Sequence, residues 1–406
     1  MSLRYACVLL LIICTPAAAA PVPVQLTDDS KCYAFPFWSP DGTCLAFFSV
    51  EDDRIGIWTM NHDGEEMRAL TENGACEFAC SDPWSPDGRH LLFVSVHDGK
   101  TDLWTMRPDG SERARLTDDG LVAPGQPSSG YGGVWSADGD AIVYTSCLYD
   151  NSGFWEVFQA SLAGEANGSV VADAVLEVRY DADLWIMDAD GGNKRALTTG
   201  GDASSPRWQP HGDKIAYLSN RSGTREIWTV ERDGTGDHQV TFTGNHVCDY
   251  AWSPGGTAIA YAAYLPGPDL ECPLSLVDLE ENSTIRLTSG HWDQSPVWSP
   301  DGTWIAFTSV TRDPPALWVT EHDGSDPVPL ASGAALSLMW PQWSPDGARV
   351  VFSTIDDLYA VVDKDPSPSP EEEDAAPLLG GRQVEVLKVT AGLSLIIVGI
   401  AFFRRR

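Results

Sequence analysis

The sequence predicts an all-β protein: a seven-bladed β-propeller of four-stranded antiparallel blades. A Trp-Ser-Pro-Asp-Gly motif recurs every 44 to 51 residues, apart from one step of 73. Short β-branched and aromatic runs, bounded by Gly, Pro and Asp, follow each copy. A period in the mid-forties is typical of radial or solenoid repeats. The motif is complete at 38–42, 84–88, 298–302 and 343–347, and degenerate at 135–139, 208–212 and 252–256.

Each repeat contains the residues for four short strands. In the second repeat the motif is followed by apolar runs at 91–95 and 103–106, an Asp-Gly turn at 109–110 and a short run at 115–117. Asp-Gly supplies the positive φ that tight hairpin turns require. One such unit cannot bury both faces, so units must pack face to face around an axis.

The repeat resembles that of TolB and its relatives, in which WSPDG is followed by IAF-x-S, IW-x-M, DG and LT. The first unit has LAFFS at 45–49, IWTM at 57–60, DG at 63–64 and LT at 70–71. The resemblance covers about residues 24–362 and implies the propeller fold. Propellers of this kind serve as scaffolds, receptors and non-catalytic domains of enzymes, so the resemblance does not define the function.

The ring is expected to be closed by the N-terminal strand. The last repeat has no fourth strand after residue 362, whereas Val24–Thr27 resembles a fourth strand placed ahead of the first motif. Pairing these segments completes the last blade and removes an open sheet edge. The propeller domain is therefore predicted to span residues 24–362.

The 73-residue step places an insertion at 147–182, within the third repeat. Its two apolar runs, 154–158 and 175–178, can pair as an extra hairpin. The alternative is a degenerate eighth blade. The hairpin is preferred because it leaves as many fourth strands as first strands.

Residues 1–19 are predicted to be a secretory signal peptide. Arg4 precedes the apolar run 6–14, and small residues follow at 17–20. Disulfides are expected in an exported protein, and Cys248 with Cys272 is the predicted pair, at the two ends of one face of the fifth repeat.

The C-terminal region is predicted to anchor the chain. Residues 363–385 form a Pro/Glu-rich disordered linker, 386–403 a transmembrane helix, and 404–406 a basic cytoplasmic tail. The terminal arginines agree with the positive-inside rule. The expected location is outside the cell, with the propeller anchored in the cytoplasmic membrane.

The charge limits the possible partners. The chain carries 58 acidic and 26 basic residues, a net charge of −32. This disfavours nucleic acid as a partner. The expected partners are a protein or glycan at the cell envelope, and the membrane through the C-terminal helix, for a monomeric propeller without a cofactor.

Binding is expected on the irregular face, where the loops entering the first strands of the blades meet the insertion. Aromatic residues gather there, ahead of the first strands or in the insertion. The candidate binding residues are Tyr33, Phe78, Tyr131, Trp155, Tyr250, Trp292 and Trp340.

The sequence contains no G-x-S-x-G nucleophile motif. We therefore expect a protein- or glycan-binding scaffold rather than an enzyme. The alternative is a metal-dependent carbohydrate-active enzyme similar to propeller polysaccharide lyases, with a divalent ion held by imidazole and carboxylate groups. Its candidate ligands are His246, Asp249, His291 and Asp293. A structural envelope component is the third possibility.

Overall fold

In the computed structural model of this chain, all regular elements of the described residues are β-strands. The described residues are 23–27, 32–51, 54–71, 76–97, 100–122, 132–147, 182–265, 271–289, 291–309, 311–312, 316–325, 327–332, 339–353 and 358–361. The predicted signal peptide, linker, anchor and tail lie outside these residues, as does nearly all of the 147–182 insertion. Within the described ranges, no helix has the length and apolar character needed to cross a bilayer.

Five sheets have four antiparallel strands each. The first contains β2 (Cys32–Trp38), β3 (Cys44–Glu51), β4 (Arg54–Asn61) and β5 (Arg68–Ala69). The next two contain β14 (Ala203–Trp208), β15 (Lys214–Ser219), β16 (Glu226–Glu231) and β17 (His238–Gln239), then β18 (Val247–Trp252), β19 (Ala258–Ala263), β20 (Leu274–Asp278) and β21 (Ser283–Arg286). The last two contain β22 (Asp293–Trp298), β23 (Trp304–Ser309), β24 (Ala316–Glu321) and β25 (Val328–Ser332), then β26 (Met339–Trp343), β27 (Val350–Ser353), β28 (Leu358–Val361) and β1 (Val24–Gln25).

One larger sheet has eight strands. Its antiparallel halves are β6 (Cys76–Trp84), β7 (Leu91–His97), β8 (Lys100–Met106) and β9 (Ala114–Arg115), and β10 (Gly133–Trp135), β11 (Ala141–Cys147), β12 (Ala182–Asp188) and β13 (Arg195–Ala196). The halves join where Val134 pairs in parallel with Asp82.

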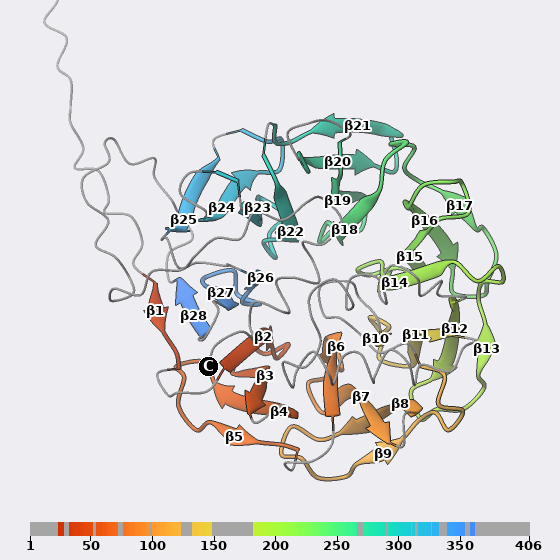
Figure 1. The fold of residues 1–406 in the computed structure, drawn as a ribbon, viewed down its shortest axis with the longest axis vertical. Helices are drawn as coiled ribbons and strands as arrows, with labels where there is room; N and C mark the ends of the chain where they lie inside the picture. The colour runs from red at the N-terminus through yellow and green to blue at the C-terminus, as the bar shows by residue number, and fades with distance from the viewer. Residues whose placement is uncertain are drawn as a thin grey trace, which may run out of the picture.

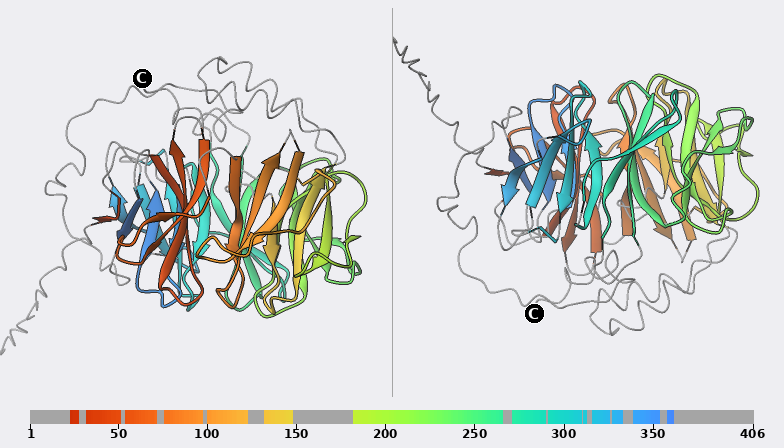
Figure 2. Two further views of the ribbon diagram at one scale, coloured as in Figure 1. Left: turned by 90° about the horizontal axis from the view of Figure 1, so that it is seen from below. Right: turned by 90° about the horizontal axis from the view of Figure 1, so that it is seen from above.

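The sheets stand side by side around a ring, with β2, β6, β10, β14, β18, β22 and β26 nearest its centre (Figure 1). The strands of each sheet run roughly along the axis of the ring (Figure 2). The predicted all-β architecture of four-stranded antiparallel blades is therefore confirmed.

The recurring pentapeptide is a turn held by its own side chains. In the first copy Ser39 Oγ donates to Asp41 Oδ1 at 2.6 Å, and Ser39 Oγ itself accepts the N–H of Cys44 at 2.9 Å. Gly42 provides the positive φ of 70°. The serine and aspartate thus satisfy backbone groups that a tight turn leaves free, which explains why the motif recurs with so little change.

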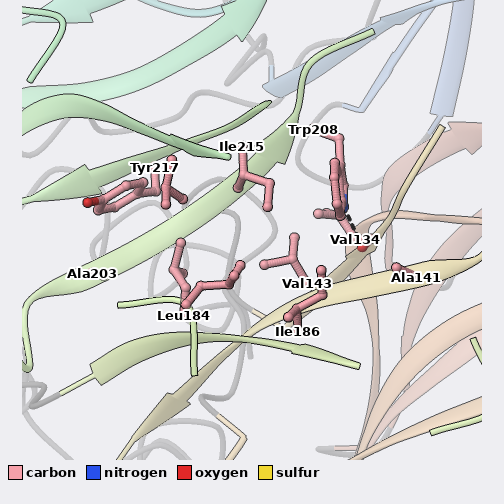
Figure 3. Packing of buried hydrophobic residues seen from close by; sticks show 11 residues of the cluster. Val134, Ala141, Val143, Leu184, Ile186, Ala203, Trp208, Ile215 and Tyr217 are labelled. Atoms are coloured by element: carbon pink, nitrogen blue, oxygen red, sulfur yellow. Dashed lines mark hydrogen bonds between the residues drawn. The ribbon is translucent and has the colours of Figure 1, made fainter. Parts of the chain in front are cut away.

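The tryptophan of the motif joins neighbouring blades. Trp84 Nε1 donates to the carbonyl oxygen of Phe37 in the preceding repeat at 3.1 Å. Trp208 Nε1 donates to the Val134 carbonyl at 3.3 Å, above a buried apolar layer (Figure 3). Trp135, Trp252 and Trp298 make the equivalent bond. Trp38 Nε1 and Trp343 Nε1 are buried with no partner among the described residues.

Acidic residues near the start of the third strands, buried or half-buried, form a second recurring network. Glu226 accepts hydrogen bonds from Thr241 Oγ1 at 2.7 Å and from the N–H of Gly244 at 2.9 Å. Asp102 and Asp183 accept the same two kinds of bond in their repeats. These acids stabilise the loops that leave the fourth strands, so they are structural groups.

The N-terminal strand closes the last sheet, as the sequence predicts. Val24 pairs with Ala360 and Gln25 with Tyr359. The N-terminal segment also makes the contact that the end of a fourth strand makes elsewhere in the ring. Gly64 lies so close to Leu26 that a Cβ on this glycine would be 2.8 Å from the Leu26 carbonyl oxygen. Gly110 approaches Leu70 in the same way one blade further on.

Candidate functional site

An arginine and two aspartates lie on innermost strands: the arginine and one aspartate on neighbouring blades, and the other aspartate on a blade beyond β10. Asp82 is on β6, Arg207 on β14 and Asp249 on β18. Arg207 Nη2 donates to Asp249 Oδ1 at 2.9 Å, and its guanidinium lies 5.0 Å from the centre of the Tyr250 ring. The pair is largely sheltered, with 27% of the arginine and 14% of the aspartate side chain exposed.

The two carboxylates differ in how far they are neutralised. Burial raises the pKa of Asp249, while Arg207 and the N–H of Tyr250 act to lower it. Burial raises the pKa of Asp82 to about 6, and the more distant charge of Arg207 opposes this only in part. Asp82 nevertheless keeps exposed surface. It is accessible to a ligand and poorly hydrated at the same time, a combination typical of functional carboxylates.

Asp82 is expected to reduce the stability of the protein at neutral pH. Its pKa is higher in the folded protein than its ordinary value of 3.8, so the folded state binds more protons between these values and stability falls as pH rises through this window. Asp82→Asn should therefore raise the melting temperature at about pH 7.5 and change it little at about pH 4. Thermal unfolding of both proteins at the two pH values tests this. An equal change at both would show that ionisation of Asp82 is not the cause.

Five blades have a residue in the left-handed region three positions before the motif tryptophan, on the innermost strand or just before it. These residues are Phe35, Gly132, Ser205, Ser295 and Trp340, with φ between 53° and 86°. Such a backbone costs a residue with a side chain roughly 1–2 kcal/mol, and glycine almost nothing. Two of the five are large aromatics, and their rings meet: the centroids of Phe35 and Trp340 are 3.5 Å apart, with the planes tilted by 31°. Both side chains are half-buried.

Most of the aromatic residues predicted to bind a ligand prove to be packing residues or cannot be placed. Tyr33 and Tyr250 have no exposed surface, and Trp292 is 5% exposed. The Tyr250 hydroxyl donates to the Ala216 carbonyl oxygen of the preceding blade at 2.8 Å, so it joins blades. Trp340 alone of the predicted set is described and partly exposed. The side chains of Phe78, Tyr131 and Trp155 lie outside what the structure describes.

The predicted metal ligands do not come together. Among the described residues, no group of three or more His, Cys, Asp and Glu side chains could hold a metal ion. Asp249 is paired with Arg207, and the fully buried Asp293 lies 3.4 Å from Arg312. His246 is exposed and His291 half-buried. The two aspartates are thus used to neutralise arginines.

The predicted disulfide is absent. Cys248 and Cys272 are free thiols with their Sγ atoms 3.2 Å apart, and the Cys248 thiol donates to the Ala262 carbonyl oxygen at 3.3 Å. The sequence correctly placed these residues next to each other, but the sulfurs are in hydrogen-bonding contact rather than bonded.

The chain belongs to the TolB β-propeller family. The family description "TolB beta propeller domain" matches residues 25–166 and 160–345. The sequence is 29% identical over 150 residues to dipeptidyl-peptidase 5 of Porphyromonas endodontalis, covering 36% of this chain and 21% of that protein. It is 28% identical over 166 residues to the uncharacterized peptidase YuxL of Bacillus subtilis, covering 32% of this chain and 25% of that protein. The chain therefore matches only about a quarter or less of these curated relatives.

Solved structures agree on the fold. An oligogalacturonate lyase in complex with manganese has a TM-score of 0.64 at 18% identity, covering 85% of this chain and 94% of that one. The oligogalacturonate lyase of Vibrio parahaemolyticus has a TM-score of 0.62 at 16% identity, covering 83% and 92%.

These comparisons contradict the expectation that the chain is not an enzyme. Two curated relatives carry peptidase names, and two solved neighbours are lyases. The expectation rested on a missing nucleophile motif, and that motif describes only one class of active site.

Sequence reasoning overlooked Arg207 and Asp82. Arg207 had one usable signal: the position just before the motif tryptophan is apolar in most repeats and cationic only here. The others are Phe37, Pro83, Val134, Ala251, Val297 and Gln342. No sequence pattern marked Asp82 as a site residue, because its environment depends on how the blades are arranged around the ring.

Proposed function

We propose that this propeller binds peptides by their amino terminus at the ring centre, with Asp82 as the partner of the ammonium group. The observation that carries this proposal is the unequal neutralisation of the two carboxylates. Asp249 has a direct arginine partner at 2.9 Å, whereas Asp82 is accessible and has its pKa raised to about 6. A ligand cation next to Asp82 would supply the missing charge.

The overall charge favours the same ligand. With a net charge of −32, the protein attracts cations and repels polyanions over long distances. The peptidase names of two relatives support peptides as the chemical class of ligand. Such recognition of a peptide would position it for a peptide-cleaving reaction, which mass spectrometry of the binding samples detects.

The setting we propose is a seven-bladed ring outside the cytoplasmic membrane, anchored by residues 386–403. Two features support the blade number. The eight-stranded sheet divides into two four-stranded halves at a single parallel pairing, and the tryptophan bonds link its halves as they link separate sheets. The location rests on the signal and anchor patterns of the sequence.

Binding of Phe-Ala-Ala-Ala amide and of its N-acetylated form, measured by calorimetry on the purified protein, tests the proposal. Only the free amine should bind, and Asp82→Asn should remove binding. Binding should also weaken as pH falls through about 6, because protonated Asp82 no longer attracts a cation. Mass spectrometry of the same samples reports any cleavage. Equal binding of the acetylated peptide, or binding of oligogalacturonate but of neither peptide, would overturn the proposal.

A further inference from the structure

The aromatic pair Phe35–Trp340 connects the innermost strands of two neighbouring sheets. The two residues come from β2 and β26, which belong to different sheets, and their ring centroids are only 3.5 Å apart. Phe35 also contacts Phe48 edge-on at 5.3 Å and packs against the apolar layer between its own sheet and that of β6. Both side chains still keep exposed surface.

The backbone at these two positions favours small residues. The three other strands with the same left-handed residue use Gly132, Ser205 and Ser295. The bulge itself therefore does not require an aromatic ring, and a bulky side chain makes it less stable. Strained backbone conformations of this kind are enriched at active sites and ligand clamps.

The aromatic pair lies next to the strand that carries Asp82. Around the ring the innermost strands follow in the order β26, β2, β6 (Figure 1). Trp84 at the end of β6 donates its indole N–H to the Phe37 carbonyl oxygen of β2, which fixes the two strands beside each other. Trp340, Phe35 and Asp82 therefore come from three successive innermost strands.

The geometry points to a specificity site for the first side chain of a bound peptide. With its amino group at Asp82, the peptide places its first side chain against Phe35 and Trp340, which favours a large aromatic or apolar residue there. This inference rests on the proposed function and adds which peptides the site prefers. Aromatic rings in offset or edge contact with the pair would supply the selectivity.

Calorimetry with Phe-Ala-Ala-Ala amide and Ala-Ala-Ala-Ala amide measures this preference. The wild-type protein should bind the Phe-first peptide at least about tenfold more tightly. Trp340→Gly should remove that preference and leave the affinity for the Ala-first peptide within about twofold, because glycine removes the ring without adding backbone strain. Phe35→Gly is a second variant with the same expectation.

Ser295→Gly is the matched control. It makes the same change at the same left-handed position of β22, where no aromatic ring is lost, so the preference should stay intact. Asp82-dependent binding that is equal for the two peptides, or a preference that survives both aromatic replacements, would overturn the inference and leave the proposed function standing. Failure of both peptides to bind the wild-type protein would overturn both.

Discussion

Replacing Arg207 with methionine is expected to destabilise the protein by about 3 kcal/mol, as is typical when one partner of a sheltered ion pair is removed. Methionine keeps much of the apolar length of the side chain but leaves Asp249, 14% exposed, without its direct cation. The contact of the guanidinium with the Tyr250 ring is lost as well. Thermal unfolding of the variant and the wild type measures the effect.

The pH dependence of this loss follows from the two carboxylates. Without Arg207 the pKa of both Asp82 and Asp249 rises further, because that cation lowers each of them. Folded-state pKa values that are raised favour the folded state at low pH, so the deficit should be largest above about pH 7 and shrink toward about pH 5.

Two companion variants separate charge from packing. Arg207→Met combined with Asp249→Asn should recover much of the lost stability, since no buried charge is then left unpaired. Lys214→Met breaks an exposed pair with Glu231 at 2.6 Å and should change stability by less than about 1 kcal/mol. A deficit that the second substitution does not reduce would mean that the Arg207 side chain contributes mainly through packing.

The fold could be predicted from the sequence because its signals are local. Ser39 and Asp41 satisfy backbone groups within five residues, and Thr241 bonds back to the third strand of its own repeat through the N–H of Ile227 at 2.9 Å. Such contacts recur wherever the pattern recurs. The closing strand could be predicted for the same reason, because Leu26 and Thr27 repeat a pattern whose other copies are internal.

The candidate site could be predicted only in part, because its contacts are not local. Arg207 and Asp249 are in different repeats, and Asp82 comes from a blade on the far side of β10. Aromatic residues ahead of the first strands were visible in the sequence, but the sequence does not show which of them pack between blades. Tyr250 packs between blades through its hydroxyl, whereas Trp340 of the closing sheet contacts Phe35 of the neighbouring sheet.

Deleting residues 23–27 is expected to be the most damaging small change at the edge of the ring. The deletion removes the two strand pairings of Val24 and Gln25 and the contact of Leu26 with the apolar layer around Tyr33 and Phe47. With roughly 1 kcal/mol for each hydrogen bond and a similar amount for the half-buried leucine, the loss is about 3 kcal/mol.

Within the described ranges, the sheet that β1 completes also lacks the tryptophan bond on both of its sides. Five motif tryptophans bond to the preceding blade, but Trp343 on β26 and Trp38 on the following blade have no partner for their indole N–H among the described residues. The deletion therefore acts on the blade whose junctions lack the recurring tryptophan bond among the described residues. Opening should begin there, so backbone amides of β26 to β28 should lose protection from hydrogen exchange before those of β14 to β17.

Removing five residues from the predicted linker at 363–385 is the matched control and should leave the melting temperature unchanged. Gly64→Ala tests the same junction by a point change, because its Cβ would lie 2.8 Å from the Leu26 carbonyl oxygen. Gly324→Ala places a Cβ 2.8 Å from the Leu287 carbonyl oxygen at an internal junction with a nearly identical backbone, so both variants carry similar local strain. If early exchange in β26 to β28 follows Gly64→Ala but not Gly324→Ala, the closing strand holds the ring together. Uniform loss of protection in every sheet after the deletion would show instead that the ring unfolds as one unit, with no weak point at its closure.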